Sequence, residues 1–249
     1  MKKVRQGIDC AQPLTTSTAG KLYALNYRFA ARYLVPADYS WKRLTRKEAE
    51  AISAAGLQIV SVFETSANRP EGGAAAGVKD GIAAYKEAQA IKQPLGTAIY
   101  FAVDYDAKAD DFDTIAAYLK AAAAQIPGYS IGVYGSYTVV EAMAKRGVAS
   151  KFWQTYAWSG GKRSARAEIY QYKNDVNVEG IRLDKNEGNG SEGAWSTVEI
   201  AQEAMTAEDA NKIIKFLSAA WGAASTQEDK LEFNRLANEL RKVSGQPFQ

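Results

Sequence analysis

The chain has 249 residues, of which 47% are hydrophobic and 24% are charged, and its formal net charge is +3. This composition is typical of a globular protein, and the length suits a single large α/β barrel. The charge is too small, and Lys and Arg are too scattered, to predict nucleic-acid binding. No apolar run approaches the roughly 20 residues that a membrane span needs.

Two residue types that serve many hydrolases are nearly or wholly missing. The sequence has no histidine and a single cysteine, Cys10. The lack of histidine excludes Ser-His-Asp and Cys-His catalysis and the zinc sites that contain histidine. One cysteine forms neither an internal disulfide nor a thiolate cluster, so Cys10 is predicted to be a small buried residue. A hydrolase of this composition must use carboxylates.

Short apolar runs rich in β-formers alternate with helical patterns over about the first 190 residues. This alternation predicts an α/β fold, a (β/α)8 TIM-type barrel that is somewhat small. A doubly wound open sheet is the rival, but the segment GIDCAQPLTT after the first run lacks the glycine-rich phosphate loop of that fold. The predicted strands are residues 5–11, 31–36, 57–64, 97–106, 130–137, 151–159, 167–172 and 180–186.

Helical patterns follow several of these strands. Thr45 and Glu48 predict a capping box at the start of a helix that ends at Gly56. Alanine-rich segments predict further helices at 77–92 and 110–125, and another helix is predicted at 137–145.

The composition changes after Asn186. A glycine-rich loop, EGNGSEG, leads into residues 194–204, which are predicted to form a last barrel helix. Two helices then begin at Thr206 and Thr226, each with an Asp three residues later, and each carries one apolar stripe. We expect a barrel over residues 1–200 and a C-terminal helical hairpin over 205–249, which packs on the barrel or forms a homodimer with its copy.

Several predicted strands carry a carboxylate at their end. Catalytic groups of a barrel lie at the C-terminal ends of its strands, and closure makes the first and eighth strands neighbours. Two acids two residues apart share a strand face at roughly 6 to 7 Å. Like charges this close raise at least one pKa, which supplies the proton donor that glycosidic bond cleavage requires. The predicted catalytic residues are Asp9, Glu64, Asp104, Asp106 and Asp184.

Aromatic and amide side chains favour a sugar as the ligand. Flat aromatic rings match the apolar faces of pyranose rings, and Gln amides bond to hydroxyl or N-acetyl groups. The segments WQTYAWS and IYQY place such side chains near the ends of the sixth and seventh strands. The predicted substrate-binding residues are Tyr134, Trp153, Gln154, Trp158 and Gln171.

Ordered motifs over residues 4–190 resemble one bacterial family. They are GIDCA, ARYLVP, KRLTRKEAEAISAAGLQIVSVFE, GTAIYFAVDYD, GYSIGVYGSY, FWQTYAWSGG and IYQY. This set is similar to a glycoside hydrolase-like domain once known only as a domain of unknown function. The resemblance implies a TIM-type barrel and a more distant relation to the lysozymes of glycoside hydrolase family twenty-five, the muramidases of many phage endolysins.

The muramidase pattern has an acid on strand one, Asp-x-Glu on strand four and Asp on strand eight. Asp9, Asp104 and Asp184 match the first acid, the Asp of Asp-x-Glu and the last Asp. Asp106 stands where the pattern has its catalytic glutamate, so the side chain is one methylene shorter. Glu64 is placed to take part.

The leading hypothesis is a glycoside hydrolase that cleaves peptidoglycan or a related polysaccharide without a cofactor or metal. In this hypothesis Asp106 is the general acid/base, and Asp104 orients the substrate's N-acetyl group in a substrate-assisted route. The other acids shape the electrostatic field and contact sugar. The N-terminus is basic but lacks the apolar segment of a signal peptide. We therefore expect synthesis in the cytoplasm and action at the cell wall after release, as in an endolysin.

Two alternatives stay open. A catalytically inactive barrel that only binds cell-wall polysaccharide would keep the cleft, and the Asp at position 106 favours it. A divalent-cation site is the other alternative, because Asp-x-Asp provides ligands for Mg²⁺ or Ca²⁺.

Overall fold

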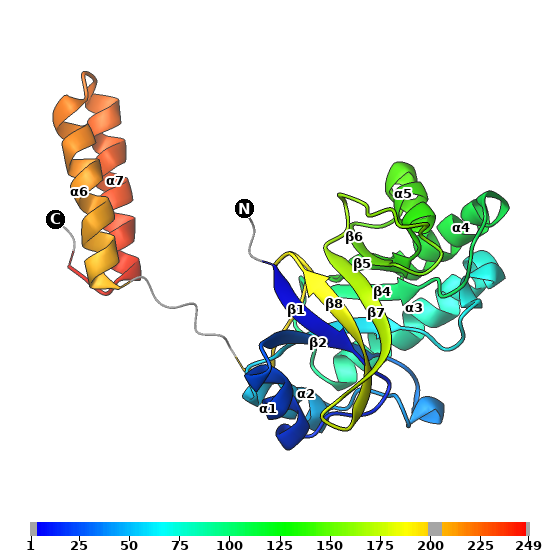
Figure 1. Cartoon of the computed structure of the whole chain (residues 1–249). Coiled ribbons are helices and arrows are strands. Elements are labelled where there is room, and N and C mark those ends of the chain that lie inside the picture. Colours follow the sequence, from blue (N-terminus) through cyan, green and yellow to red (C-terminus); the bar gives the residue numbers. More distant parts are fainter. Residues whose placement is uncertain (1–3, 199–205, 248–249) are drawn as a thin grey trace. The chain divides into compact units, whose positions relative to one another are not determined.

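Eight strands, hydrogen-bonded in chain order, close into a barrel in the first of the two units into which the chain divides after Val198 (Figure 1). The computed structural model describes residues 4–198 and 206–247. The predicted barrel is confirmed. Its strands are β1 (Arg5–Asp9), β2 (Tyr27–Tyr33), β3 (Gln58–Phe63), β4 (Ala98–Ala102), β5 (Ser130–Gly135), β6 (Lys151–Thr155), β7 (Ile169–Val178) and β8 (Ile181–Gly188).

Helices follow the first five strands and cover their outer faces. The α-helices of this unit are α1 (Thr16–Ala24), α2 (Arg46–Ala54), α3 (Gly73–Ala90), α4 (Phe112–Ala123) and α5 (Tyr137–Arg146), and the short 3-10 helices are η1 (Ala37–Tyr39), η2 (Arg69–Gly72) and η3 (Ala109–Asp111). Helix α1 was not predicted. The described part of the expected last barrel helix, residues 194–198, is not helical, and the rest lies outside the described residues.

The barrel departs from an all-parallel arrangement at its closure. Strands β1 to β6 each run parallel to the next strand, whereas β8 is antiparallel to both β7 and β1. Glu179 and Gly180, with φ of 53° and 81°, form a tight turn between β7 and β8, as is typical of a two-residue hairpin. Because Asp9, the last residue of β1, pairs with Asp184, this hairpin extends beyond the end of β1.

Several strand boundaries differ from the prediction; β6, for example, ends at Thr155 rather than at residue 159. Strand β2 spans Tyr27–Tyr33 rather than residues 31–36. The apolar residues 34–36, which suggested a strand, form a largely buried loop after it. Strand β4 ends at Ala102, short of the acidic residues that follow. Strand β7 continues to Val178, because the polar residues of its second half alternate on a hairpin with one solvent-facing side.

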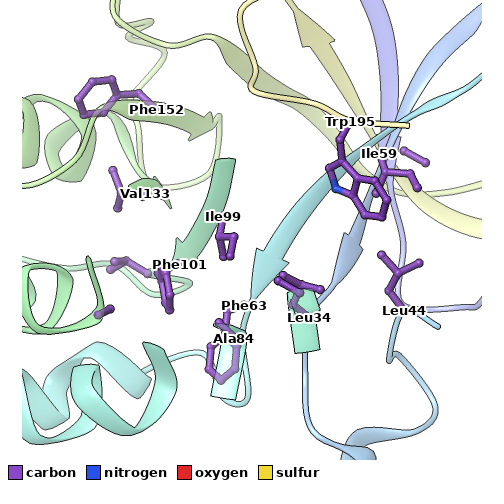
Figure 2. Close-up of a cluster of buried hydrophobic side chains, with 14 of the residues drawn as sticks. Leu34, Leu44, Ile59, Phe63, Ala84, Ile99, Phe101, Val133, Phe152 and Trp195 are labelled. Carbon is purple, nitrogen blue, oxygen red and sulfur yellow. The ribbon is translucent and has the colours of Figure 1, made fainter. Parts of the chain in front are cut away.

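Alternation along the strands divides the core into two clusters. On β4, Ile99 and Phe101 face the helices, and Tyr100 and Ala102 face the barrel interior. Figure 2 shows the outer cluster, where Trp195 lies beside Ile59; their backbones form a short antiparallel bridge. Since side chains alternate, Asp104 continues the interior series beyond the strand end.

The capping residue of α2 is confirmed, but its reciprocal bond is absent. The Thr45 hydroxyl accepts from the backbone N–H of Glu48 at 3.2 Å. The Glu48 carboxylate does not return to Thr45; it is buried against Arg32, 2.6 Å from Nε. Cys10 is buried as predicted, and burial raises its pKa to about 12.

The second unit contains the predicted pair of helices, α6 (Ala207–Ala223) and α7 (Gln227–Val243), which run side by side (Figure 1). Thr206 and Thr226 cap them as expected. The buried core between the helices is small, formed by Ala210, Ile214 and Ala237. Homodimerisation through this hairpin stays a prediction. Within the described residues, no helix has the length and apolar character to cross a bilayer.

Close packing of α3 on α4 depends on glycine. A Cβ at Gly77 would overlap the backbone carbonyl oxygen of Tyr118, whereas a Cβ at Gly20, within α1, would meet no atom within 4 Å. We expect Gly77→Ala to lower the free energy of unfolding by about 1–3 kcal/mol through overpacking. The control Gly20→Ala should raise it by about 0.4–1 kcal/mol. Urea denaturation measures both, and equal effects would contradict this account of the helix contact.

Candidate active site

A cavity of about 110 Å³ opens at the mouth of the barrel, at the C-terminal ends of the parallel strands. Barrels of this kind place their catalytic groups at this end. Four of the five predicted acids meet here. The lining residues are Asp9, Tyr33, Val62, Glu64, Ala102, Asp104, Tyr134, Trp153, Gln171, Asn174 and Asp184.

Asp9 and Asp184 lie together where the barrel closes, as predicted, because they are direct partners in the β1–β8 pairing. The Gln171 amide nitrogen donates to both carboxylates, at 2.8 Å to Asp9 and 3.1 Å to Asp184. Asn186 donates to the same Asp9 oxygen at 2.7 Å. The two carboxylates are therefore joined by an amide bridge.

Burial and mutual repulsion act on this pair. Burial first, and then the charge of Asp184, raises the pKa of Asp9, while the bonds from Asn186 and Gln171 lower it. The pKa of Asp184 is also raised, mainly by burial. A proton on one of the two carboxyl groups relieves the repulsion, so the pair retains a proton well above the usual pH range of aspartate.

Asp104 is the third acid of the pocket and is anchored by its backbone, whose N–H donates to the Ala67 carbonyl at 3.1 Å. Burial, followed by the charge of Glu64, raises its pKa from 3.8 to about 6, although the neighbouring Tyr134 hydroxyl opposes the shift. Asp104 thus holds a proton under mildly acidic conditions and releases it near neutrality.

Glu64 faces a buried cation that the sequence did not reveal. The Lys42 ammonium lies 3.5 Å from the Glu64 carboxylate, and the Lys42 side chain is only 7% exposed. The same ammonium lies over the Tyr33 ring, 4.5 Å from its centroid. Lys42 comes from the irregular segment after η1, where no periodic pattern marks an inward position.

Three of the predicted substrate-binding residues line the pocket and support the acids. The Tyr134 hydroxyl donates to the side-chain oxygen Oε1 of Gln171 at 2.8 Å. The Trp153 indole N–H donates to Oδ1 of Asn186 at 2.9 Å. Asn186 was missed, although it follows Asp184 on the same face of β8. Asn174 was also missed; its carbonyl oxygen is buried and has no hydrogen-bond partner in the described part of the chain, so it is open to a ligand donor.

Two other predicted binding residues lie elsewhere. Gln154 is fully buried and holds the loop after β6, donating to the Lys162 carbonyl and accepting from the Ser164 N–H. Trp158 lies exposed on the same loop, outside the pocket lining.

Asp106 also lies outside the pocket lining. Its side chain is 50% exposed, and its carboxylate pairs with Lys108 at 2.5 Å. The expectation that Asp104 and Asp106 share a strand face is wrong, because β4 ends at Ala102 and the backbone then turns. The position of Asp106 therefore does not fit the predicted role of general acid.

The pocket acids are held by amides, a tyrosine and an ammonium. Within residues 4–198 and 206–247, no group of three or more His, Cys, Asp or Glu side chains is arranged to hold a metal ion.

A closed barrel with buried carboxylates, aromatic rings and amides at its mouth is the arrangement of a glycoside hydrolase-like barrel. The chain belongs to the family described as Rv2525c-like, glycoside hydrolase-like domain, whose family model matches residues 20–188.

Relatives agree with this assignment. The uncharacterized protein FadG of Bacillus subtilis (strain 168) is 32% identical over an alignment of 161 residues. The match covers 58% of this chain and 27% of FadG, so the chain spans about a quarter of that relative's length. The Tat-secreted protein Rv2525c of Mycobacterium tuberculosis, solved in complex with L-tartrate, shares the fold with a TM-score of 0.70 at 24% identity, covering 79% of this chain and 100% of that chain.

A phage enzyme shares the fold at lower identity. The catalytic domain of endolysin ply40, from bacteriophage P40 of Listeria monocytogenes, superimposes with a TM-score of 0.53 at 14% identity, covering 78% of this chain and 97% of that chain. The resemblance inferred from the sequence is thereby confirmed for the family, and the relation to endolysins is confirmed for the fold.

The raised pKa of Asp104 predicts a pH-dependent stability. Since its pKa is about 6 when folded and 3.8 in the reference state, its contribution is fully present below pH 3.8 and is lost as pH rises through 6. Asp104→Asn should therefore gain stability relative to the native protein as the pH rises from about 4 to about 7, the window that the two pKa values set. The upper limit is roughly 3 kcal/mol, reduced by solvent screening. Urea denaturation at both pH values, with exposed Asp110→Asn as control, measures it; a gain independent of pH would contradict the cause given.

Proposed function

We propose that the barrel is a glycoside hydrolase that cleaves the glycan strands of peptidoglycan by carboxylate acid–base catalysis, with Asp104 as proton donor. The observation that carries the proposal is the position of Asp104: a partly buried carboxyl, with a pKa of about 6, inside a pocket of further carboxylates. A donor of this kind, beside ionised partners, is what hydrolysis of a glycosidic bond requires.

The proposed reaction uses the pocket as follows. Protonated Asp104 gives its proton to the glycosidic oxygen as the bond to the anomeric carbon breaks, so the leaving sugar departs as a neutral alcohol. The negative charge on the Asp9–Asp184 pair stabilises the positive charge that develops on the sugar ring. Water then adds to the anomeric carbon, and the proton it loses returns to Asp104. Gln171, bonded to both members of the pair, keeps them in place.

The assignment of the donor differs from the one made from the sequence. The family pattern favours position 106, but Asp106 is exposed and paired with Lys108. The choice of peptidoglycan is supported by the resemblance to muramidases and by the fold shared with an endolysin catalytic domain. The proposal includes action at the cell wall.

A glycan-binding barrel without catalysis is the second candidate. The small cavity and the shortened residue at position 106 favour it, because both limit how well a donor reaches a glycosidic oxygen. In this candidate the same carboxylates and amides bond sugar hydroxyls. For this candidate, the expected result is measurable glycan binding without release of reducing ends.

Paired variants test the donor. Asp104→Asn should lower the release of reducing ends from purified peptidoglycan at least about 100-fold, the contribution of a general acid. Asp106→Asn should retain most of the activity, with a rate that still falls as pH rises above about 6, the pKa of Asp104. The reverse pattern would return the donor role to Asp106. No release by the native protein, alongside measurable glycan binding, would favour the second candidate.

A further inference from the structure

The pocket is smaller than the ligand it is proposed to serve. Its cavity of about 110 Å³ lies well below the roughly 300–1,000 Å³ of common ligand sites. The cavity has room for the atoms around one glycosidic bond and little more of a glycan. Affinity for a glycan strand must come from surfaces beside the pocket, and two exposed tryptophans on the barrel stand at its rim.

Trp41 stands on the β2 side of the mouth, on the segment after η1. It is 62% exposed, and the Lys42 ammonium lies 5.4 Å from its ring centroid. That ammonium also contacts two pocket residues, Tyr33 and Glu64. The Lys42 carbonyl is fixed by the buried Arg32, whose Nη2 donates to it at 3.1 Å. Trp41 is therefore held near the pocket on a well-anchored segment.

Trp158 stands on the loop after β6 and is 43% exposed. Its φ of 53° lies in the left-handed region, which is unfavourable for a bulky residue and marks local strain. The turn is anchored on both sides of the ring. The Ser159 hydroxyl donates to the Thr155 carbonyl at 2.6 Å, and the Tyr156 N–H donates to the carbonyl of pocket residue Gln171 at 2.9 Å.

The two rings flank the pocket from opposite sides. In the closed order β1 to β8, strands β2 and β6 are four places apart in either direction. Segments that follow their C-terminal ends therefore lie across the mouth from each other. A linear ligand that contacts both rings must pass over the acids between them.

We propose that Trp41 and Trp158 are stacking platforms for pyranose rings, so that the site binds an extended glycan strand across the mouth and cleaves it internally. The inference rests on the proposed function for the bond that is cut, but the binding mode stands without cleavage. Exposed apolar residues occur singly on most surfaces. Here both have indole rings, both are anchored, and both are tied to pocket residues.

Binding as a function of chain length tests the platforms. Calorimetry with chitooligosaccharides should show that the native protein binds a hexasaccharide at least tenfold more tightly than a disaccharide. Trp41→Ala should lower hexasaccharide affinity about tenfold, a loss of about 1.4 kcal/mol, and leave the disaccharide nearly unaffected. Leu95→Ala, which removes a 69% exposed residue before β4, at the other end of the barrel, is the matched control and should change neither affinity.

Trp158 offers a variant that separates binding from folding. Trp158→Gly relieves the left-handed backbone, which offsets part of the packing lost with the half-buried ring. It should therefore remain folded in the absence of urea while losing hexasaccharide affinity like Trp41→Ala. Phe at either position keeps a ring and should restore most of the affinity. Native affinity that is independent of chain length, or Ala and Gly variants that bind like the native protein, would overturn the inference.

Digestion products separate this inference from the proposed function. If the strand is cut internally, early digests of peptidoglycan glycan should contain long fragments, and exclusive release of disaccharides would overturn the inference. If the native protein cleaves nothing but binds with the expected length and tryptophan dependence, the platforms stand and the proposed hydrolase fails. If it cleaves and both tryptophan variants bind like the native protein, the hydrolase stands and the platforms fail.

Discussion

The site depends on one electrostatic constraint: two aspartates are forced together where the barrel closes. Asp9 and Asp184 are direct partners across the β1–β8 pairing, so neither moves away without opening the barrel. Their repulsion is moderated by Gln171 and Asn186, whose amides donate to them, and by a retained proton. The closure of the fold thus places Asp184 where its charge raises the pKa of Asp104.

A second buried interaction holds the rim around this pair. Arg32 is fully buried and bonds to the Glu48 carboxylate and to the carbonyls of Cys10 and Lys42. The first carbonyl follows Asp9 in the chain, and the second belongs to the residue that pairs with Glu64. Removing either partner of a buried ion pair is costly because the other charge stays unpaired. One guanidinium therefore fixes loops from two strands, which explains how irregular segments hold pocket residues in place.

The periodicity of the sequence predicted the strands and the side of the sheet that their residues face. It did not predict features that depend on single turns, such as the direction of a strand or the residue at which it ends. Alternation on β4 placed Asp104 on the interior side, and the positions of Asp9 and Asp184 followed from barrel closure. The direction of β8 depends on the turn at Glu179 and Gly180, which a strand-like pattern does not reveal. The end of β4 at Ala102 was equally hidden, and so the placement of Asp106 was wrong. Inward side chains from irregular segments carry no periodic signal at all.

The charge of the pocket bears on which polymer it accepts. Four carboxylates line it, and Lys42 is the cation paired with one of them. An anionic polymer would add repulsion in a partly desolvated space, where charges interact more strongly than in water. A neutral N-acetylated sugar avoids that cost and supplies the N–H and hydroxyl donors that carboxylates and the unpartnered Asn174 carbonyl accept. In the proposed mechanism, the acids that supply the proton chemistry therefore also favour an uncharged glycan at the point of cleavage.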